Sequence, residues 1–429
     1  MPLGMTKATH ISEHKGHKEL TKHQKILEYL DPKYVYFPAQ RPDLEYEVLV
    51  KVGDEVRIGD VLTISKAYFP VITHSSVSGK VTAVDKKVWH PSGRKISAIE
   101  IENNFKEEVT YLKEQPLTKE GIIEAIKQAG IVGMGGAGFP THVKYHHPKF
   151  QTDTLIVNAV ECEPYLTCDC VSIKYRAKEL IQGIKYAMIA NDAKRTVIAV
   201  KECHKDVIAL LEEELAKEEN ISLYILKDVY PAGWEKYIVE KVQNKTYKGL
   251  PCETGAVVSN VSTLIAINDA ISKKMPSVER VITVSGEGIK NPQNVLVKIG
   301  TLASEIIDKT GGYAEDLESG YLVAGGPMTG TSQFFDSFMV EKTTTGLLVF
   351  KEQQGKEEAC LGCGKCIDNC PVKLSPILIK LAYEDKDKEK MTKLHADLCM
   401  ECGLCSYTCP SRIELTEAVG KAKKVVRGK

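Results

Sequence analysis

The sequence predicts a multidomain chain of mixed α/β and α+β class, and three observations carry this prediction. A length of 429 residues exceeds what one hydrophobic core usually serves. The first third contains short β-rich runs cut by glycine, and the middle alternates helical with strand patterns. A dense group of cysteines follows near the C-terminus. The 57 basic residues balance 57 acidic ones, so the overall charge favours neither nucleic acid nor an anionic membrane as a partner.

Residues 1–40 are predicted to form a polar amino-terminal extension, and residues 41–112 a small β domain. Gly53 and Gly59, each followed by aspartate, are turn signals between alternating strands. The β domain resembles the barrel-sandwich domain of the lipoyl and biotinyl carrier families. Those families attach their cofactor to a lysine at a hairpin tip, whereas the corresponding segment Ser75–Gly79 contains no lysine. We therefore expect a scaffold or docking module without an attached cofactor.

Residues 113–275 are predicted to form an α/β domain around a glycine-rich loop. Thr118 can cap a helix that stops before this loop, which spans residues 133–141. The closely spaced glycines let backbone N–H groups approach a phosphate or a planar ring, although a purely structural loop is the alternative. A buried-strand pattern at 155–160 then ends in polar residues, and ligands commonly bind beyond the carboxyl ends of such strands.

Residues 276–352 are predicted to form a β-rich domain with one short helix near 302–309. The predicted strands lie at 281–284, 321–324 and 346–350. The sequence Gly325-Gly326-Pro327 has two interpretations, a phosphate loop and a β-turn, and the pattern favours the turn.

The cysteine-rich region consists of two runs with the same spacing, C-x2-C-x2-C-x3-C-P, which is typical of bacterial two-cluster ferredoxins. The runs are Cys360, Cys363, Cys366 and Cys370, and then Cys399, Cys402, Cys405 and Cys409. In such folds the fourth cysteine of each run ligates the other cluster. The predicted ligands are Cys360, Cys363, Cys366 and Cys409 for cluster 1, and Cys399, Cys402, Cys405 and Cys370 for cluster 2. Paired zinc sites are the alternative.

Residues 353–416 are thus predicted to form a ferredoxin-like domain with two [4Fe–4S] clusters, and residues 417–429 a basic tail. Three further cysteines, Cys162, Cys168 and Cys170, are predicted to be buried free thiols, with a metal site or a redox disulfide as the alternative.

Three segments of the α/β domain resemble the flavin-binding motifs of the NADH-oxidising subunit of respiratory complex I. They are Gly135-Gly136-Ala137-Gly138-Phe139-Pro140-Thr141 with Lys144, then Asn158 with Glu161-x-Glu163-Pro164, and Ser259-Asn260-Val261-x-Thr263-Leu264. The order of barrel, flavin domain and two-cluster domain is more similar to RnfC, the NADH-facing subunit of the Rnf complex, which couples NADH and ferredoxin to ion pumping. Further RnfC-like marks are Glu161–Thr167 and Gly325–Gly330.

The resemblance implies a Rossmann-like α/β domain that binds FMN and a β-grasp-type (SLBB-like) domain at 276–352. The implied flavin contacts are Gly133, Gly135, Gly136 and Gly138 along the ring and ribityl chain, Lys144, Asn260 and Thr263 at the phosphate end, and Asn158 at a polar edge. The implied NADH contacts are Phe139 near the nicotinamide, with Glu161 and Glu163 beside it. The sequence departs from complex I at Met134, where an arginine is usual, and from RnfC at Phe37–Gln40, where a longer segment is usual.

The implied function is NADH-linked electron transfer. Hydride passes from NADH to FMN, and single electrons then pass through the two clusters to or from a ferredoxin-like protein or another redox subunit. One alternative is a soluble paralogue that relays electrons to a dedicated reductase of the cobalamin or proline type. Another is a ferredoxin-like relay without flavin. The sequence has no apolar run near the ~20 residues that span a bilayer. We expect a cytoplasmic protein, peripheral on the cytoplasmic face of the membrane if it joins an Rnf complex.

Overall fold

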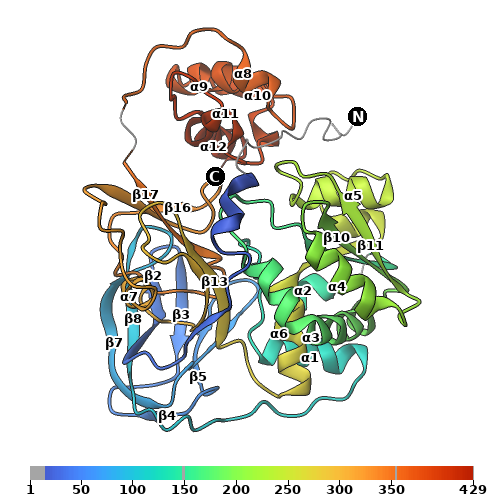
Figure 1. Cartoon of the computed structure of the whole chain (residues 1–429), viewed down its shortest axis with the longest axis vertical. Helices are drawn as coiled ribbons and strands as arrows, with labels where there is room; N and C mark the ends of the chain where they lie inside the picture. The colour runs from blue at the N-terminus through green and yellow to red at the C-terminus, as the bar shows by residue number, and fades with distance from the viewer. Residues whose placement is uncertain (1–14, 147–149, 353–354, 429) are drawn as a thin grey trace.

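The computed structural model describes residues 15–146, 150–352 and 355–428. These residues form a β barrel, a parallel α/β unit, a second sheet and a helical cysteine-rich unit, which lies above the other three in Figure 1. None of the helices within the described ranges is both long enough and apolar enough to cross a membrane. The predicted mixed α/β and α+β class is confirmed.

The barrel is a seven-stranded sheet with the order β4-β7-β8-β2-β3-β5-β6. Its strands are β2 (Tyr34–Arg41), β3 (Leu44–Val48), β4 (Glu55–Val56), β5 (Val61–Ser65), β6 (Ile72–His74), β7 (Gly79–Trp89) and β8 (Lys95–Asn103). Side chains such as Phe37, Leu62 and Ile99 alternate into its core. At the turn before β5, Gly59 has φ +93°, and a Cβ there would lie 2.3 Å from the carbonyl oxygen of Thr110. Only glycine fits this turn.

The α/β unit has a four-stranded parallel sheet with the order β11-β10-β9-β12. Its strands are β9 (Thr154–Ala159), β10 (Arg195–Lys201), β11 (Ile221–Leu226) and β12 (Ala256–Asn260). Its helices are α1 (Lys119–Gln128), α2 (Thr141–Tyr145), α3 (Cys168–Asn191), α4 (Lys205–Leu215), α5 (Glu235–Gln243), α6 (Val261–Ser272) and the 3-10 helix η2 (Pro251–Thr254). The chain runs outward from β9 to β11 and returns to the other side of β9 as β12. The order of the strands therefore reverses between β9 and β12, where α/β sheets commonly bind ligands.

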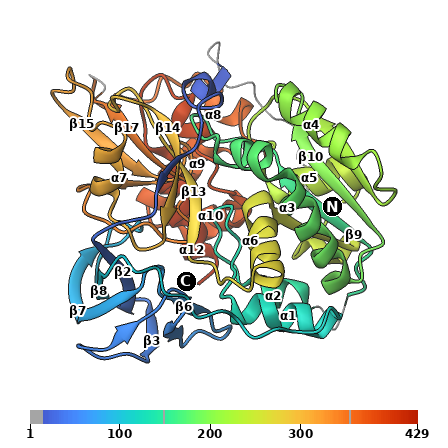
Figure 2. The ribbon, with the colours of Figure 1, turned by 60° about the horizontal axis from the view of Figure 1, so that its bottom comes forward.

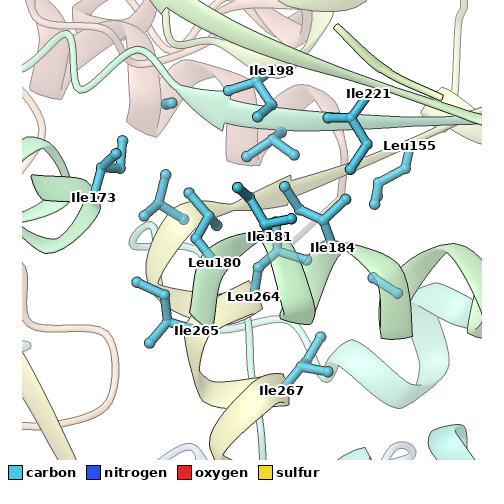
Figure 3. Packing of buried hydrophobic residues seen from close by; sticks show 14 of the residues in the cluster. Leu155, Ile173, Leu180, Ile181, Ile184, Ile198, Ile221, Leu264, Ile265 and Ile267 are labelled. Carbon is cyan, nitrogen blue, oxygen red and sulfur yellow. The ribbon is translucent and has the colours of Figure 1, made fainter. Parts of the chain in front are cut away.

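Packing of α3 and α6 against this sheet forms the core of the α/β unit. Figure 3 shows Ile181 and Ile184 of α3 beside Leu264 of α6, with Ile198 and Leu155 from the strands facing them. Thr118 caps α1 as predicted, because its Oγ1 accepts a hydrogen bond from the Gly121 N–H at 3.2 Å.

The second sheet has six strands in the order β1-β14-β13-β17-β15-β16. Its elements are β1 (Leu27–Tyr29), β13 (Glu279–Ser285), β14 (Gln293–Lys298), β15 (Gly320–Ala324), β16 (Thr331–Gln333), β17 (Gly346–Lys351) and the helix α7 (Ala303–Lys309). The three predicted strands and the short helix are all present. The sheet begins with β1, which pairs in parallel with β14 from a position far away in the sequence. Before β1, the 3-10 helix η1 (Lys15–Leu20) is drawn just below the cysteine-rich unit in Figure 1.

The cysteine-rich unit contains the helices α8 (Lys365–Asp368), α9 (Pro376–Glu384), α10 (Lys388–Lys393), α11 (Leu404–Tyr407), α12 (Leu415–Val426) and the 3-10 helix η3 (Ala396–Leu398). The short helices α8 and α11 repeat one design, since each begins after a glycine with a left-handed backbone inside a cysteine run. Val372 and Leu374 of this unit pack with Ile238 of α5, so the cysteine-rich and α/β units share a core cluster.

Two predicted boundaries differ from the structure. The boundary predicted at residue 40 falls inside β2, which pairs with β8 of the barrel. The strand β1 belongs to the second sheet, because strands can pair by hydrogen bonding across long distances in the sequence. Residues 1–14 of the predicted extension lie outside the described residues. The predicted basic tail at 417–429 falls mainly on α12, whose apolar side, with Val419 and Ala422, packs in the cluster shared with α9. Lys429 lies outside the described residues.

Candidate functional site

A cavity of about 840 Å³ lies between the glycine loop and the barrel. The site residues from the sequence prediction that line it are Gly135, Gly136, Gly138, Phe139, Asn158, Glu161, Glu163 and Asn260. Asn158 is in β9 and Asn260 ends β12, so the cavity opens where the strand order reverses. Figure 2 shows the barrel strands beside α1 and α2, which flank the loop. The volume is in the range of small-molecule and cofactor sites.

The glycine loop is closed by its own backbone. The Gly133 N–H donates to the carbonyl of Phe139 at 2.8 Å, and the Gly138 N–H donates to the carbonyl of Gly133 at 3.1 Å. Between them, Gly136 has φ +115°, and a Cβ placed there would meet nothing within 4 Å. A side chain at Gly136 would therefore project into open space at the cavity wall. This cradle of bare backbone fits a flat cofactor such as a flavin.

Two cations support the loop, the buried Arg280 of β13 and the half-buried Lys342 in the turn before β17, and sequence reasoning missed both. The Arg280 guanidinium lies 3.5 Å from the Met134 carbonyl oxygen and also donates to the carbonyl of Lys342. The Lys342 ammonium donates to the carbonyls of Ile72 at 3.0 Å and Gly130 at 2.7 Å. Burial lowers the pKa of Lys342 to about 8. Neither position belongs to a motif, so the sequence carries no signal for them.

Asn260 joins the cavity wall to a carboxylate at the start of α3. Its Oδ1 accepts from the Ser262 N–H at 2.9 Å, which caps α6, and its Nδ2 donates to Asp169 at 2.6 Å. Burial, together with the charge of Glu161, raises the pKa of Asp169 to about 6. The oxygens of Glu161 accept from the N–H groups of Asp169 at 2.8 Å and Cys170 at 3.2 Å.

Glu161 is held in its ionised form. Burial opposes its charge, but the nearby Lys18 ammonium and the two α3 amides outweigh burial and lower its pKa. A carboxylate at the first turn of α3 also suits the positive end of the helix dipole. Glu161 therefore anchors the start of α3 as well as lining the cavity.

Glu163 is the second acidic residue of the wall. It accepts hydrogen bonds from the Met328 N–H at 3.0 Å and from the Thr329 hydroxyl. Burial raises its pKa. A Cβ at Gly326 would lie 2.3 Å from Oε2 of Glu163, so the Gly325-Gly326-Pro327 segment packs directly on this carboxylate. The backbone of Gly325-Gly326-Pro327 therefore contacts the Glu163 side chain at the cavity wall.

Three predicted flavin contacts do not line the cavity. The Lys144 ammonium is 3.1 Å from an oxygen of Glu235 on α5. Thr263 is buried and its Oγ1 accepts from the Met134 N–H at 2.9 Å, while Gly133 closes the loop described above. Thr263 and Gly133 therefore hold the shape of the loop, and the phosphate contact of Lys144 stays a prediction. Asn158 does line the cavity, and its Nδ2 donates to the Gly233 carbonyl at 2.9 Å.

The four cysteines predicted for cluster 2 come together from both runs. Cys370, Cys399, Cys402 and Cys405 all line one small cavity of about 20 Å³. Backbone N–H groups already point at sulfur there: Leu374 donates to Cys370 and Glu401 to Cys399, both at 3.3 Å. Amide donors of this kind stabilise thiolates that hold a cluster. The donor set, four sulfurs from two runs, fits a cubane.

The cysteines predicted for cluster 1 are more open to solvent. Cys366 and Cys409 meet in a cluster with Ile413 and Leu415, whereas Cys360 and Cys363 are exposed. Within the described ranges, no three His, Cys, Asp or Glu side chains are grouped closely enough to hold a single metal ion.

The second cysteine run packs on the wall of the large cavity. The Tyr230 hydroxyl donates to the Cys402 carbonyl at 2.7 Å, and Cys162 of the cavity wall lies in the same apolar cluster. Met328, which binds Glu163 through its N–H, also belongs to this cluster. A Cβ at Gly403 would lie 2.6 Å from the Met328 carbonyl oxygen, so the contact is close. One layer of residues thus joins the two predicted redox sites.

The comparisons with known proteins assign a domain to each of these units. The sequence matches the RnfC barrel sandwich hybrid domain at residues 9–106, the Nuo51 FMN-binding domain at 126–269, the SLBB domain at 281–332 and the 4Fe-4S dicluster domain at 359–413. The fold and site thus define a flavin and iron–sulfur electron-transfer protein. The chain belongs to the RnfC family, because it is 33% identical to the C component of the Na+-translocating ferredoxin:NAD+ oxidoreductase complex of Acetobacterium woodii, over 77% of this chain and 76% of that protein.

Other relatives of the same family match this chain at a similar level of identity. The C component of the proton-translocating ferredoxin:NAD+ oxidoreductase complex of Clostridium ljungdahlii is 33% identical over 82% of this chain and 78% of its own length. The C component of the ion-translocating oxidoreductase complex of Vibrio cholerae is 34% identical over 81% of this chain, which spans 46% of that longer protein. Among solved structures, a chain of an NAD+-reducing [NiFe]-hydrogenase shares the fold, with a TM-score of 0.51 and 16% identity over 72% of this chain and 61% of that one.

Proposed function

We propose that this chain is an NADH-linked electron-transfer subunit that carries FMN and two [4Fe–4S] clusters. It passes electrons between NADH and a ferredoxin-like or redox-subunit partner. One observation carries the proposal: the second cysteine run packs in one apolar cluster with Tyr230, Met328 and Cys162, and Cys162 also lines the glycine-loop cavity. A site for a two-electron donor and a site for one-electron carriers therefore adjoin in one chain.

FMN is proposed to bind in the large cavity. The bare backbone of Gly135, Gly136 and Gly138 would lie along it, with Asn158 and Asn260 offering amide groups at the edges. When bound, the flavin exchanges hydride with a nicotinamide and single electrons with clusters. The side chains of this chain bind, orient and shield the flavin, and none is required as a general acid or base on carbon. Glu161 and Glu163 are proposed to lie beside the NADH.

The clusters are proposed to follow the crossed arrangement. Cluster 2 would be held by Cys399, Cys402, Cys405 and Cys370, and cluster 1 by Cys360, Cys363, Cys366 and Cys409. The small cavity that Cys370 shares with the second run supports the crossing. The burial of Cys370 and Cys402, with the N–H groups that point at the sulfurs of Cys370 and Cys399, would tune the potential of a cluster held there.

The proposed setting is an ion-translocating ferredoxin:NAD+ oxidoreductase complex, as the names of the relatives state for them. The chain would sit at the cytoplasmic face of such a complex and exchange electrons with its neighbouring redox subunits or with ferredoxin.

The test is an anaerobic purification followed by a titration with NADH, monitored by the visible spectrum. The proposal expects about eight iron atoms and one flavin per chain, and bleaching of both chromophores by NADH. Iron without flavin, together with a spectrum that NADH leaves unchanged, would reduce the chain to a ferredoxin-like relay and contradict the proposal.

A further inference from the structure

The loop after β9, residues 161–167, has a strained backbone and carries both carboxylates that are proposed to lie beside NADH. Glu161 has φ +39° and Tyr165 has φ +64°, in the left-handed region that residues other than glycine rarely adopt. Such conformations persist only where the surrounding structure holds them, and they cluster at binding and catalytic sites. The contacts that hold this loop therefore bear on the site itself.

The main contacts come from residues 16–21, a segment within the predicted polar extension. The Lys18 ammonium donates to the carbonyl of Glu163 at 2.9 Å and to the carbonyl of Leu166. The Lys18 side chain is buried, which is rare for lysine unless its charge is compensated. One buried ammonium thus bonds the loop at two points, three residues apart in the sequence.

Other residues of the same segment hold the middle and the end of the loop. The Tyr165 N–H donates to the Gly16 carbonyl at 2.6 Å, and the rings of His17 and Tyr165 are stacked with centroids 4.5 Å apart. At the end of the loop, the hydroxyl oxygens of Thr21 and Thr167 are 2.7 Å apart. The segment therefore fixes the strained Tyr165 through both its backbone and its ring.

Lys18 also compensates the charge of the acidic side chains on the loop. Burial raises the pKa of Glu161, and the Lys18 ammonium is the largest of the influences that lower the pKa again. Burial raises the pKa of Glu163 too, and Lys18 is among the groups that oppose this rise. The same cation therefore bonds the backbone of the loop and stabilises its carboxylates.

We propose that Lys18 is a positioning residue for NADH: through its hydrogen bonds to the loop, it holds Glu161 and Glu163 in the cavity wall. The inference rests on the proposed function, in which both carboxylates lie beside the dinucleotide. Lys18 is not among the described residues that line the large cavity, so it acts through the loop and not by contact with the substrate. The amino-terminal segment thereby belongs to the NADH site, although the chain continues from it towards the barrel.

The test follows flavin reduction by NADH without oxygen, in a stopped-flow spectrometer at a series of NADH concentrations. Lys18→Met keeps the length of the side chain but removes its charge and its hydrogen bonds. We expect the apparent Kd for NADH to rise about tenfold. The limiting rate at saturating NADH and the flavin content are expected to stay unchanged, because Lys18 contacts neither reactant. Hydrogen exchange of residues 161–167 is expected to become faster.

Lys22→Met is the matched control, because Lys22 comes from the same part of the chain but pairs with Glu19 at 2.6 Å instead of with the loop. His17→Ala is a milder variant, which removes only the ring stacked on Tyr165. It is expected to raise the apparent Kd for NADH about threefold. If Lys18→Met does not retain flavin, His17→Ala decides the question by the same measurements.

The inference is overturned if the Kd for NADH or the exchange of residues 161–167 is unchanged in Lys18→Met. An equal rise of the Kd in Lys22→Met also overturns it, since any lost lysine charge would then have the same effect. All these outcomes leave a parent protein that NADH reduces. If NADH does not reduce the parent protein at all, the proposed function fails, and the inference about NADH fails with it.

Discussion

Gly136 shows how a single missing side chain can define a cofactor site. Its left-handed backbone and the open space around it mean that Gly136→Leu would place a side chain in the cavity without a clash inside the protein. We expect this variant to lose flavin while it keeps its iron, measured as flavin and iron content per chain.

A matched control separates cavity filling from backbone strain. Gly53 has φ +96° and equally open surroundings, but it does not line the cavity. Gly53→Leu should therefore carry a similar strain and retain flavin. Flavin retained in Gly136→Leu, or lost from both variants, would count against the loop assignment.

The crossed cluster ligation makes a prediction for single cysteines. Cys370→Ala is expected to remove the same paramagnetic resonance signal as Cys399→Ala, and Cys409→Ala the same signal as Cys360→Ala. Each change should lower the iron content by about four atoms. If Cys370→Ala instead matched Cys360→Ala, each run would hold its own cluster. Cys252→Ala is the control, because this thiol is buried outside both runs.

His204 links protonation to stability. Burial lowers its pKa to about 4, with Lys18 and Lys201 acting in the same direction and Glu161 and Asp228 opposing. As the pH falls from 6.5 towards 4, the unfolded chain takes up a proton at His204 before the folded chain does. The free energy of unfolding is therefore highest above pH 6.5 and falls through this pH range. One such group gives a slope of about 1.4 kcal/mol per pH unit.

His204→Asn is therefore expected to flatten the fall of the thermal midpoint between pH 6.5 and 4, measured anaerobically. Asparagine also suits the position, which is the residue before α4. His23→Asn, at an exposed histidine, is the control. An unchanged pH dependence in His204→Asn would show that another group dominates this range.

At the scale of elements, α1 leads directly into the glycine loop, so its first turn matters for the site. Thr118→Ala removes the hydroxyl that accepts from Gly121 and should lower the local opening free energy of α1 by about 1 kcal/mol. Hydrogen exchange of 119–128 measures this, and Thr118→Ser should preserve protection. Equal exchange in Thr118→Ala and the parent would show that packing alone holds the helix.

Elements with a local signal could be predicted from the sequence. Three features depend only on neighbours within a few residues: the cap at Thr118, the buried strand β9 and the spacing of the cysteine runs. Arg280 and Lys342 could not be predicted, since they act on carbonyls more than 60 residues away. Periodicity and motif spacing describe one segment at a time and say nothing of such partners.

The same reason explains the missed boundaries and the pairing of Lys144. The strand β1 finds its partner β14 across most of the chain, and Lys144 faces Glu235 only because α2 and α5 approach in the fold. A candidate list drawn from motifs therefore names eight residues of the cavity wall but leaves out the groups that support the loop from other domains.

At the scale of the whole molecule, Lys342 connects three units, because it precedes β17 of the second sheet and donates hydrogen bonds to the barrel and to the α/β unit. Lys342→Met would leave the carbonyls of Ile72 and Gly130 without this donor, at a cost of about 1–3 kcal/mol. We expect faster hydrogen exchange in residues 66–74 and 129–141 together.

Lys290→Met is the control, because Lys290 pairs with Glu315 at the surface. A Lys342→Met protein that exchanges like the parent in both segments would show that the domains are held by other contacts.

The position of Arg280 and Lys342 in the chain also bears on biosynthesis. A ribosome releases the barrel and the glycine loop long before it reaches residue 342, and domains generally fold in the order in which they emerge. Until then, the hydrogen bonds from Lys342 to the Gly130 carbonyl and from Arg280 to the Lys342 carbonyl cannot form. We therefore expect flavin to bind only after residue 342 has been synthesised, and a chain arrested before residue 342 to bind no flavin.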